Sequence, residues 1–256
     1  MTAPALTIIA LTGVPRVRPG DDLVALLSAS LERMGLLLQA QDIVVVAQKI
    51  VSKAEGRLAR LAGVLPSARA RELATVTGKD PRHLELVLAE SDEILRAKTN
   101  VIIVSHRLGL VMANAGIDRS NVEQDAGGES VLLLPLDPDA SAEGIRAGLE
   151  QRYGVRLGVV VTDSIGRAWR LGTVGHAIGA AGVPAVIDQR GQSDLTGRAL
   201  EVTETAFADG VAAAAVLVMD EAAEGTPAAL VRGLAWTAPE KPAAALIRPK
   251  REDMFR

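Results

Sequence analysis

The chain has 256 residues, of which 48% are hydrophobic and 23% charged, the ordinary balance of a soluble globular protein. Its net charge of −3 comes from interspersed acidic and basic residues, which argues against a nucleic-acid-binding protein, and the lack of cysteine excludes disulfides, thiolate metal sites and cysteine nucleophiles. The apolar N-terminal stretch has no basic leader, and no run approaches the ~20 apolar residues of a membrane span. We therefore expect a cytoplasmic protein that binds neither nucleic acid nor membrane.

The first half of the chain alternates strand and helix patterns. The predicted elements are strands at residues 6–11 and 43–47 and helices at residues 19–35, 67–77 and 81–98. Asp21 or Asp22 would cap the first helix, because a side-chain oxygen there can accept a free backbone N–H. Gly35 and Gly78 stand where C-terminal cap glycines belong.

The second half continues this alternation. The predicted elements are a strand hairpin at residues 101–104 and 108–113, strands at 131–135, 155–161 and 227–234, and helices at 137–154 and 205–222. Asp139 is predicted as a helix cap, and the tail after Trp236 either wraps the surface or is loose. Alternating strands and helices indicate an α/β (mixed α+β) fold, in one domain over residues 1–256 with room for two subdomains.

Three of the predicted apolar strands end in clusters of polar residues. The strand at residues 43–47 is followed by Gln48, Ser52 and Lys53, and the strand at 108–113 by Asn114, Asp118 and Asn121. The strand at 155–161 is followed by Thr162, Asp163, Ser164, Arg167 and Arg170. We expect a binding site there, because the carboxyl ends of strands in open α/β sheets form the crevice where ligands bind. A single strand-end Asp is more often a turn former or a helix cap, so the prediction depends on the three clusters together.

Asp118 and Asp163 offer hard oxygen donors to a metal ion. With no cysteine, and with His83, His106 and His176 scattered along the chain, a zinc or copper site is not expected. Carboxylates and a serine hydroxyl suit Mg²⁺ or Mn²⁺, which bridge protein carboxylates and nucleotide phosphates. We expect the strand predicted at residues 155–161 to end on Asp163, so that this metal ligand is held rigidly at the sheet edge.

Basic residues at two of the strand ends, and glycines after Asp163, accompany this predicted metal ligand. Lys53, Arg167 and Arg170 would supply positive charge for phosphates, although each of them alone reads as a solvated surface charge. The chain contains no Walker A loop, no G-x-G-x-x-G fingerprint and no evident Ser-His-Asp relay. The glycines of residues 175–182 would let a large ligand approach the backbone, or they simply allow close packing. The residues therefore indicate a metal-and-phosphate site of unusual type.

Seven segments spread along the chain carry a family resemblance. "RPGDDL", "VVVAQKIVSKAEGR", "NAGIDRSNV", "LLPLDPDASAEGIR", "VVVTDSIGRAWRLG", "AIGAAG" and "EGTPAALVRG" resemble the coenzyme F420-0:L-glutamate ligase family, collinearly over residues 12–234. The resemblance implies an unusual α/β fold that forms an intertwined homodimer. It also implies a chain without the fused nitroreductase-like domain that some actinobacterial relatives carry.

The resemblance implies a ligase reaction in coenzyme F420 biosynthesis. GTP and a divalent metal, Mg²⁺ or Mn²⁺, with K⁺ as a further ion, would serve to attach L-glutamate to the side chain of F420-0. The γ-phosphate of GTP would pass to the acceptor carboxylate, and the glutamate amine would attack the resulting acyl phosphate. Some members of the family add further γ-linked glutamates.

The resemblance also implies roles for single residues. Those that would contact GTP are Val14, Pro15, Arg16, Val17, Gln48, Lys53 and Asn121. Those that would hold the metal are Asp118, Asp163, Ser164 and Glu221. Arg167, Arg170 and His176 are predicted phosphate or substrate contacts.

The sequence departs from the family pattern at several of these places. Ser164 replaces a Thr of many relatives and keeps the hydroxyl, whereas Asp220 and Glu221 replace a Gly-Gln pair whose Gln is a metal ligand. His176 stands where several relatives have Phe, and Gly210 replaces a Glu. These departures keep two non-ligase alternatives open, a metal-dependent nucleotide phosphohydrolase and a GTP-binding module without catalysis.

Overall fold

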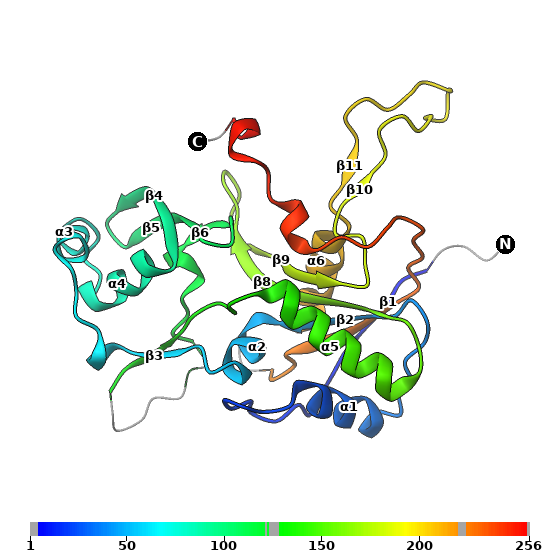
Figure 1. Cartoon of the computed structure of the whole chain (residues 1–256), viewed down its shortest axis with the longest axis horizontal. Coiled ribbons are helices and arrows are strands. Elements are labelled where there is room, and N and C mark those ends of the chain that lie inside the picture. Colours follow the sequence, from blue (N-terminus) through cyan, green and yellow to red (C-terminus); the bar gives the residue numbers. More distant parts are fainter. Residues whose placement is uncertain (1–4, 121, 123–127, 220–223, 255–256) are drawn as a thin grey trace.

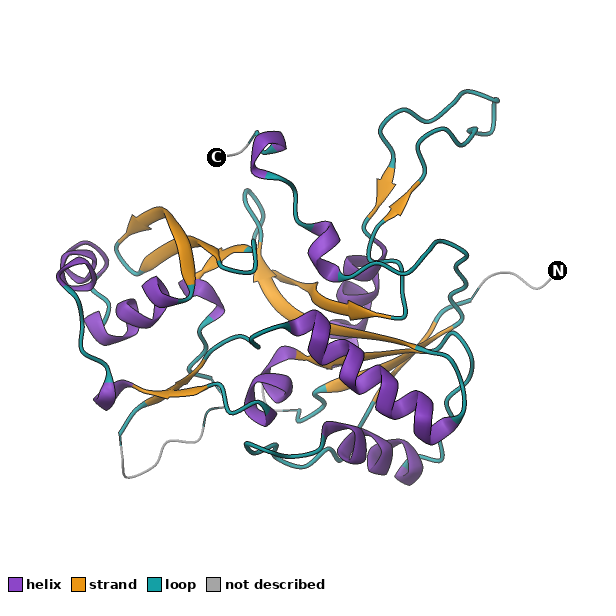
Figure 2. Cartoon of the chain, viewed as in Figure 1, coloured by secondary structure: helices purple, strands orange, loops and turns teal. Residues whose placement is uncertain are grey.

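The computed structural model describes residues 5–120, 122, 128–219 and 224–254, and its centre is a five-stranded sheet (Figures 1 and 2). The strands, in spatial order, are β1 (Thr7–Ala10), β12 (Ala228–Arg232), β2 (Ile43–Ala47), β8 (Gly158–Gly166) and β9 (Thr173–Ala181). Only β2 and β8 pair in parallel, and the other neighbours are antiparallel. The sheet is therefore mixed, which confirms the predicted mixed α/β class.

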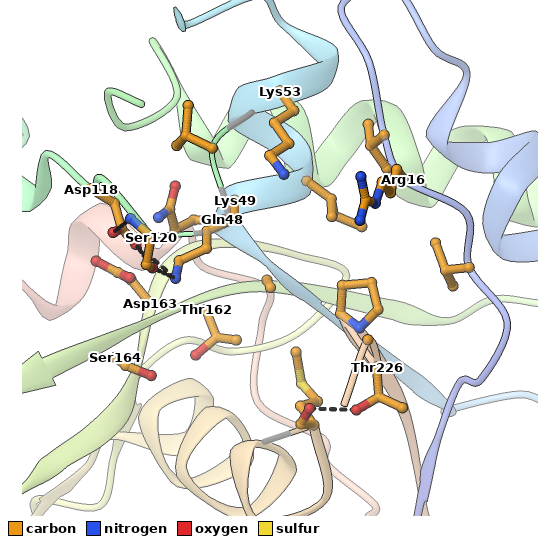
Figure 3. Close-up of a pocket in the computed structure, with 18 of the residues that line it drawn as sticks. Arg16, Gln48, Lys49, Lys53, Asp118, Ser120, Thr162, Asp163, Ser164 and Thr226 are labelled. Atoms are coloured by element: carbon orange, nitrogen blue, oxygen red, sulfur yellow. Dashed lines mark hydrogen bonds and ion pairs between the residues drawn. The ribbon is translucent and has the colours of Figure 1, made fainter. Parts of the chain in front are cut away.

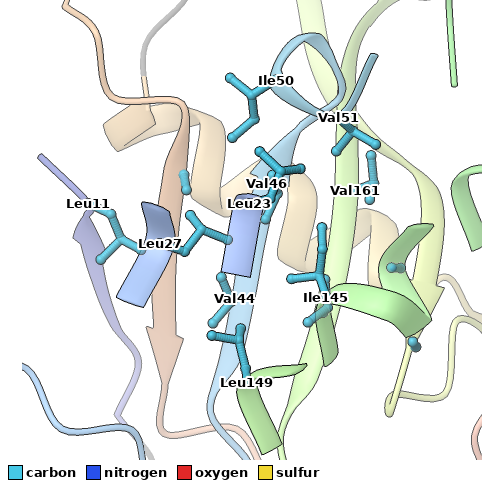
Figure 4. Close-up of a cluster of buried hydrophobic side chains, with 14 of the residues drawn as sticks. Leu11, Leu23, Leu27, Val44, Val46, Ile50, Val51, Ile145, Leu149 and Val161 are labelled. Carbon is cyan, nitrogen blue, oxygen red and sulfur yellow. The ribbon is translucent and has the colours of Figure 1, made fainter. Parts of the chain in front are cut away.

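Helices cover both faces of this sheet. On one face lie α1 (Leu23–Arg33), α2 (Gln48–Ala54) and α5 (Pro138–Tyr153), and on the other lies α6 (Phe207–Met219). Alternate residues of β2 serve the two layers, since Val44 and Val46 pack under α1 and α5, as Figure 4 shows, while Ile43 and Val45 pack under α6. Burial on both faces explains why residues 43–47 read as an unbroken apolar run.

A small lobe with its own hydrophobic core lies beside the sheet, at the left of Figure 1. It contains α3 (Ala68–Thr77), α4 (Pro81–Ala89), β4 (Ser91–Lys98), β5 (Val101–His106), β6 (Val111–Ala113) and the short helical turn η2 (Asn114–Gly116). A two-stranded ribbon of β3 (Leu58–Arg60) and β7 (Ser130–Leu132), preceding and following these elements, leads into the lobe and out of it. The fold thus carries the chain away from β2 and returns it before β8.

The prediction of one helix over residues 81–98 is wrong in its second half. The helix α4 ends at Ala89, and residues 91–98 form β4, which pairs antiparallel with β5. Glu90, at the junction, is held by ion pairs with Arg57 at 2.8 Å and with Arg107 at 3.1 Å. Local helix preference lost here because β5 offers a complete set of backbone partners.

The expectation that the strand β8 ends at Asp163 is wrong, because β8 continues to Gly166 and then turns into β9. Asp163 lies opposite His176 in this hairpin, just past a register shift between Val161 and Thr162. The expectation failed because polar residues mark the end of burial, whereas the strand itself continues as long as β9 supplies hydrogen bonds.

Of the two roles considered for the glycines of residues 175–182, approach of a large ligand and close packing, Gly175 and Gly179 of β9 have the second. A β-carbon on Gly175 would lie 2.6 Å from the Ala212 carbonyl oxygen of α6, and one on Gly179 would overlap the Pro138 carbonyl oxygen of α5. Helices on both faces therefore approach the β9 backbone more closely than any side chain would allow.

Replacing Gly179 with Ala is expected to lower the free energy of unfolding by about 1–3 kcal/mol, because α5 must shift away from β9. The matched control is Gly144→Ala, at an exposed position of α5 where an added β-carbon meets nothing within 4 Å. This control is expected to raise stability by about 0.5–1 kcal/mol. Urea denaturation of both variants measures the difference, and equal effects would contradict the packing argument.

The tail after Trp236 wraps the surface, the first of the two alternatives, and Asp139 attaches it. The predicted cap role of Asp139 is wrong, since Asp137 caps α5 by accepting the N–H of Ala140 at 3.0 Å. The Asp139 carboxylate instead accepts backbone N–H groups of Ala180 in β9 and of Ala243 and Ala244 in the tail. Pro138 occupies the first helical position, so either neighbouring Asp looks like a cap by pattern alone.

A long arm projects from the body between β9 and α6 (Figures 1 and 2). It begins and ends with the short pair β10 (Ile187–Asp188) and β11 (Glu204–Thr205), which no sequence pattern had indicated. Leu195 and Val202 are fully or nearly fully exposed on this arm. None of the helices in the described part of the chain is both long and apolar enough to cross a bilayer.

Candidate active site

A cavity of about 890 Å³, called the nucleotide cavity after the GTP that the sequence resemblance predicts for it, opens at the carboxyl ends of β2 and β8 (Figure 3). These two strands are parallel, with Ala47 opposite Thr162, so the residues that follow them emerge at the same edge. The loop after β1, the start of α2 and the segment before β12 complete the wall. Asp118 reaches the cavity from the small lobe, where it bridges to Leu132.

The nucleotide cavity collects most of the predicted site residues. Those that line it are Val14, Pro15, Arg16, Val17, Gln48, Lys53, Asp118, Asp163 and Ser164. Asn121 and Glu221 lie outside the residues that the structure describes. The convergence of Asp118 and Asp163, far apart in sequence, is as we expected from the strand ends.

Three predicted contacts lie elsewhere. Arg167 and Arg170 are in the turn between β8 and β9, where Arg167 donates to the Leu171 carbonyl at 3.4 Å and Arg170 is exposed. His176 lies on β9 with its Nδ1 2.8 Å from the Val174 carbonyl oxygen. None of the three lines the nucleotide cavity as the structure describes it, and their contact with substrate stays a prediction.

Asp118 is held by a dense set of donors. Lys49 Nζ lies 2.7 Å from its Oδ2, and the Ser120 backbone N–H donates to its Oδ1 at 2.7 Å. Burial by itself would raise the pKa of Asp118, but the contacts with Lys49 and Ser120 outweigh it and hold the pKa below its ordinary value. Asp118 is therefore a carboxylate at neutral pH.

Asp163 has the opposite electrostatic balance. Burial, together with the negative charge of Asp118, raises the pKa of Asp163 from 3.8 to about 6, against the opposing effects of the Ser164 N–H, Lys49 and Gln48. The Ser52 hydroxyl donates to Gln48 Oε1 at 2.9 Å, which leaves the Gln48 amino group to donate toward Asp163. The two carboxylates thus repel each other in a partly buried site.

The donor set fits a hard divalent cation. Asp118 and Asp163 provide two carboxylates, Ser164 provides a hydroxyl, and the buried Thr162 hydroxyl has no hydrogen-bond partner in the described chain. Oxygen donors of this kind are those that Mg²⁺ and Mn²⁺ prefer, and a cation would remove the repulsion between the carboxylates. The described residues contain no group of three or more His, Cys, Asp or Glu side chains placed to hold a metal ion. The metal ligands available in the described part of the chain are therefore the two carboxylates and the hydroxyl groups.

Positive charge faces this acidic wall from the other side of the cavity. Arg16, from the loop after β1, and Lys53, from the last turn of α2, lie across the cavity from Asp118 and Asp163 (Figure 3). Guanidinium and ammonium groups bind phosphate oxygens by charge-assisted hydrogen bonds. The cavity therefore suits a ligand that carries phosphates and shares a metal with the acidic wall.

Sequence reasoning missed Lys49, Ser120 and Thr226. Lys49 and Lys53 are four residues apart, so a predicted helix directly after β2 would have placed both on one face. Ser120 donates its hydroxyl to Asp118 at 3.1 Å, and Thr226 donates to the carbonyl of Met219 at the end of α6. No local pattern distinguishes these last two from ordinary surface residues.

Comparison with known proteins identifies the family. The sequence profile of the F420-0:gamma-glutamyl ligase family matches residues 13–233, which include every lining residue of the nucleotide cavity. The chain belongs to the F420-0:gamma-glutamyl ligase family. The family that the seven segments resembled is thereby confirmed.

Relatives match the chain over nearly its whole length. A protein of Methanothermobacter thermautotrophicus named coenzyme F420:L-glutamate ligase is 43% identical over 253 residues, covering 98% of this chain and 99% of its own. Proteins of the same name from Methanopyrus kandleri and Archaeoglobus fulgidus are 46% and 43% identical and cover 94% and 95% of this chain, each over 94% of its own length. The homodimer and the cytoplasmic location stay predictions.

Proposed function

We propose that the chain is a GTP-dependent ligase that attaches L-glutamate to coenzyme F420-0 through an acyl-phosphate intermediate, in coenzyme F420 biosynthesis. The family match over residues 13–233 supports the ligase activity. The nucleotide cavity, with carboxylates on one wall and cations on the other, supports the use of a metal-bound nucleotide. The observation that carries the proposal is that all the residues lining this cavity lie within the segment that matches the ligase family.

The proposed chemistry needs two group transfers. A carboxylate oxygen of F420-0 attacks the γ-phosphorus of GTP, the bond to the β–γ bridging oxygen breaks, and GDP leaves. The glutamate amine then attacks the acyl carbon, the carbon–oxygen bond to phosphate breaks, and the amide, inorganic phosphate and one proton are released. Phosphorylation is required because an unmodified carboxylate has no adequate leaving group.

The residues of the nucleotide cavity would mainly position reactants and stabilise charge. Arg16 and Lys53 would bind phosphate oxygens of GTP. Asp118, Asp163 and Ser164 would hold Mg²⁺ or Mn²⁺, and the cation would neutralise negative charge on the phosphates. Gln48, oriented by Ser52, would fix the Asp163 side chain.

The test incubates the protein with F420-0, GTP, L-glutamate and Mn²⁺ and measures glutamate addition by mass spectrometry beside GDP release. We expect a product one glutamyl residue heavier, and none when F420-0, glutamate or metal is omitted. If GTP is hydrolysed at the same rate in the presence and in the absence of F420-0 and glutamate, the result would instead indicate a phosphohydrolase. Tight GTP binding without turnover would indicate a binding module, and either outcome would overturn the ligase.

A further inference from the structure

A second cavity, of about 460 Å³, lies in the small lobe on the other side of Asp118. Its lining residues are Gly78, Lys79, Asp80, His83, Asn100, Asn114, Ile117, Asp118 and Arg119. Asp118 lines both cavities, so the two adjoin at this carboxylate. The lining of the second cavity is rich in polar side chains, and of these the proposed function uses only the Asp118 carboxylate.

Two buried polar groups of this cavity are unsatisfied. The His83 side chain belongs to a residue only 6% exposed, and its Nδ1 has no hydrogen-bond partner in the described chain. The Oδ1 atom of the half-buried Asn114 is also shielded from solvent, and it too has no hydrogen-bond partner there. Because buried polar atoms are nearly always hydrogen-bonded, two orphans in one wall point to a ligand that satisfies them.

The backbone beneath Asn114 is held in an uncommon conformation. Asn114 and Ala115 have φ values of 53° and 54°, in the left-handed region, which Asn tolerates but which Ala rarely adopts. Ala115 is fully buried in the core of the small lobe, so the surrounding packing holds it there. Such backbone conformations concentrate at ligand sites, where they aim a side chain.

The charge of the second cavity is positive. Its two acidic residues are already neutralised, Asp80 by Arg82 at 2.6 Å and Asp118 by Lys49 at 2.7 Å. Arg119 is paired with Glu129, whereas the half-buried Lys79 ammonium makes no ion pair with any residue in the described ranges. Lys79 is therefore the cation in this wall best placed to bind an anionic ligand.

The imidazole of His83 responds to the same positive field. Burial first, and then the charges of Lys79 and Arg119, lower the pKa of His83 from 6.5 to about 4. His83 is consequently neutral at physiological pH, when one ring nitrogen donates and the other accepts a hydrogen bond. A neutral ring beside a lysine suits an anion that also carries donor groups.

We propose that the second cavity binds the amino-acid substrate, a dicarboxylic α-amino acid, with a carboxylate on Lys79 and polar contacts to Asn100, Asn114 and His83. This inference rests on the proposed function, which needs an amine nucleophile beside the nucleotide cavity. A cavity of about 460 Å³ is large enough for a free amino acid. Because the two cavities adjoin at Asp118, the amine of the bound amino acid would lie beside the acyl phosphate. The Lys79 ammonium selects an anionic side chain over a neutral one.

The test replaces Lys79 with Met, which keeps the aliphatic length and removes the charge. We expect the Kd for L-glutamate, measured by isothermal titration calorimetry with and without a non-hydrolysable GTP analogue and Mn²⁺, to rise roughly 10- to 100-fold. The KM for glutamate is expected to rise by a similar factor, while the KM for GTP and the thermal midpoint stay unchanged. Lys79→Arg, which keeps the cation, is expected to restore most of the glutamate affinity.

The matched control is Lys98→Met, an exposed lysine at the end of β4 in the same lobe that lines neither cavity. This variant is expected to bind glutamate as the wild type does. Unchanged glutamate affinity in Lys79→Met would overturn the inference, as would binding of inorganic phosphate but not of glutamate by the wild type. If the wild type fails to ligate but binds glutamate through Lys79, the reaction is wrong and the amino-acid site stands.

Discussion

Replacing Asp163 with Asn is expected to leave the protein folded and to lower its metal-dependent turnover by about 10- to 100-fold or more. Asn keeps the size of the side chain and one oxygen, but it removes the negative charge that attracts a divalent cation. Asp163 and Asp118 line the same cavity, so the variant retains only one of the two described carboxylates. Initial rates of glutamate addition over a Mn²⁺ titration measure the effect, and the half-saturating Mn²⁺ concentration should rise.

The same variant should not lose stability in metal-free buffer. Burial and the charge of Asp118 raise the pKa of Asp163 from 3.8 to about 6, so the folded protein binds its proton more tightly than the unfolded chain. Between these two pH values the folded state holds more protons, and this residue therefore makes stability fall as pH rises. Asn cannot titrate, so in EDTA the thermal midpoint of the variant should equal or exceed that of the wild type at pH 7.

The control for Asp163 is Asp188→Asn, on the exposed strand β10. Asp188 pairs with Arg190 at 2.6 Å and lines neither cavity. Its replacement is expected to leave the rate and its Mn²⁺ dependence unchanged. Full activity of a folded Asp163→Asn protein at low Mn²⁺ would remove Asp163 from the site and reduce it to a residue of the β8–β9 hairpin.

Replacing Asp139 with Ala is expected to lower the free energy of unfolding by about 3–5 kcal/mol. Asp139 Oδ1 accepts the N–H groups of Ala180 at 2.8 Å and Ala243 at 2.7 Å, and Oδ2 accepts that of Ala244 at 3.1 Å. The carboxylate thus joins α5, β9 and the C-terminal tail, and its loss leaves the buried donors of Ala180 and Ala243 without an acceptor. In a domain of this size the thermal midpoint should fall by roughly 10 °C.

Asp137→Ala is the matched control, since Asp137 is the N-cap of the same helix two positions earlier. Loss of a cap costs about 1 kcal/mol, so the midpoint should fall by only a few degrees. Asp139→Asn keeps one oxygen and should fall between the two. A larger loss for Asp137 than for Asp139 would show that the tail contacts contribute little to stability.

Local patterns predicted those elements whose signals act within a few residues. Asp22 caps α1 by accepting the N–H of Ala25 at 3.1 Å, and Gly78 closes α3 with a φ of 70°. The strand at residues 43–47 has the predicted bounds, since an apolar run between polar residues needs only burial on both faces. In each case the residues that decide the structure lie next to one another in the sequence.

Predictions failed where a distant partner decided between two local choices. Residues 91–98 have a local pattern that predicts a helix, but they form a strand because β5 pairs with them. β8 extends past Asp163 because β9 continues beside it. Asp137 and Asp139 both resemble caps, and only the position of Ala243, 104 residues beyond Asp139, distinguishes their roles.

The sequence by itself determined the family and the chemistry available to the site, because the motifs around Gln48, Asp118 and Asp163 are short and contiguous. Only the tertiary structure decided that Lys49 neutralises Asp118 and that a second cavity adjoins the first at this carboxylate. The physical reason is that ionisation and hydrogen bonding depend on distances of about 3 Å in space. Separation along the chain does not specify such distances until the sheet and the small lobe have packed together.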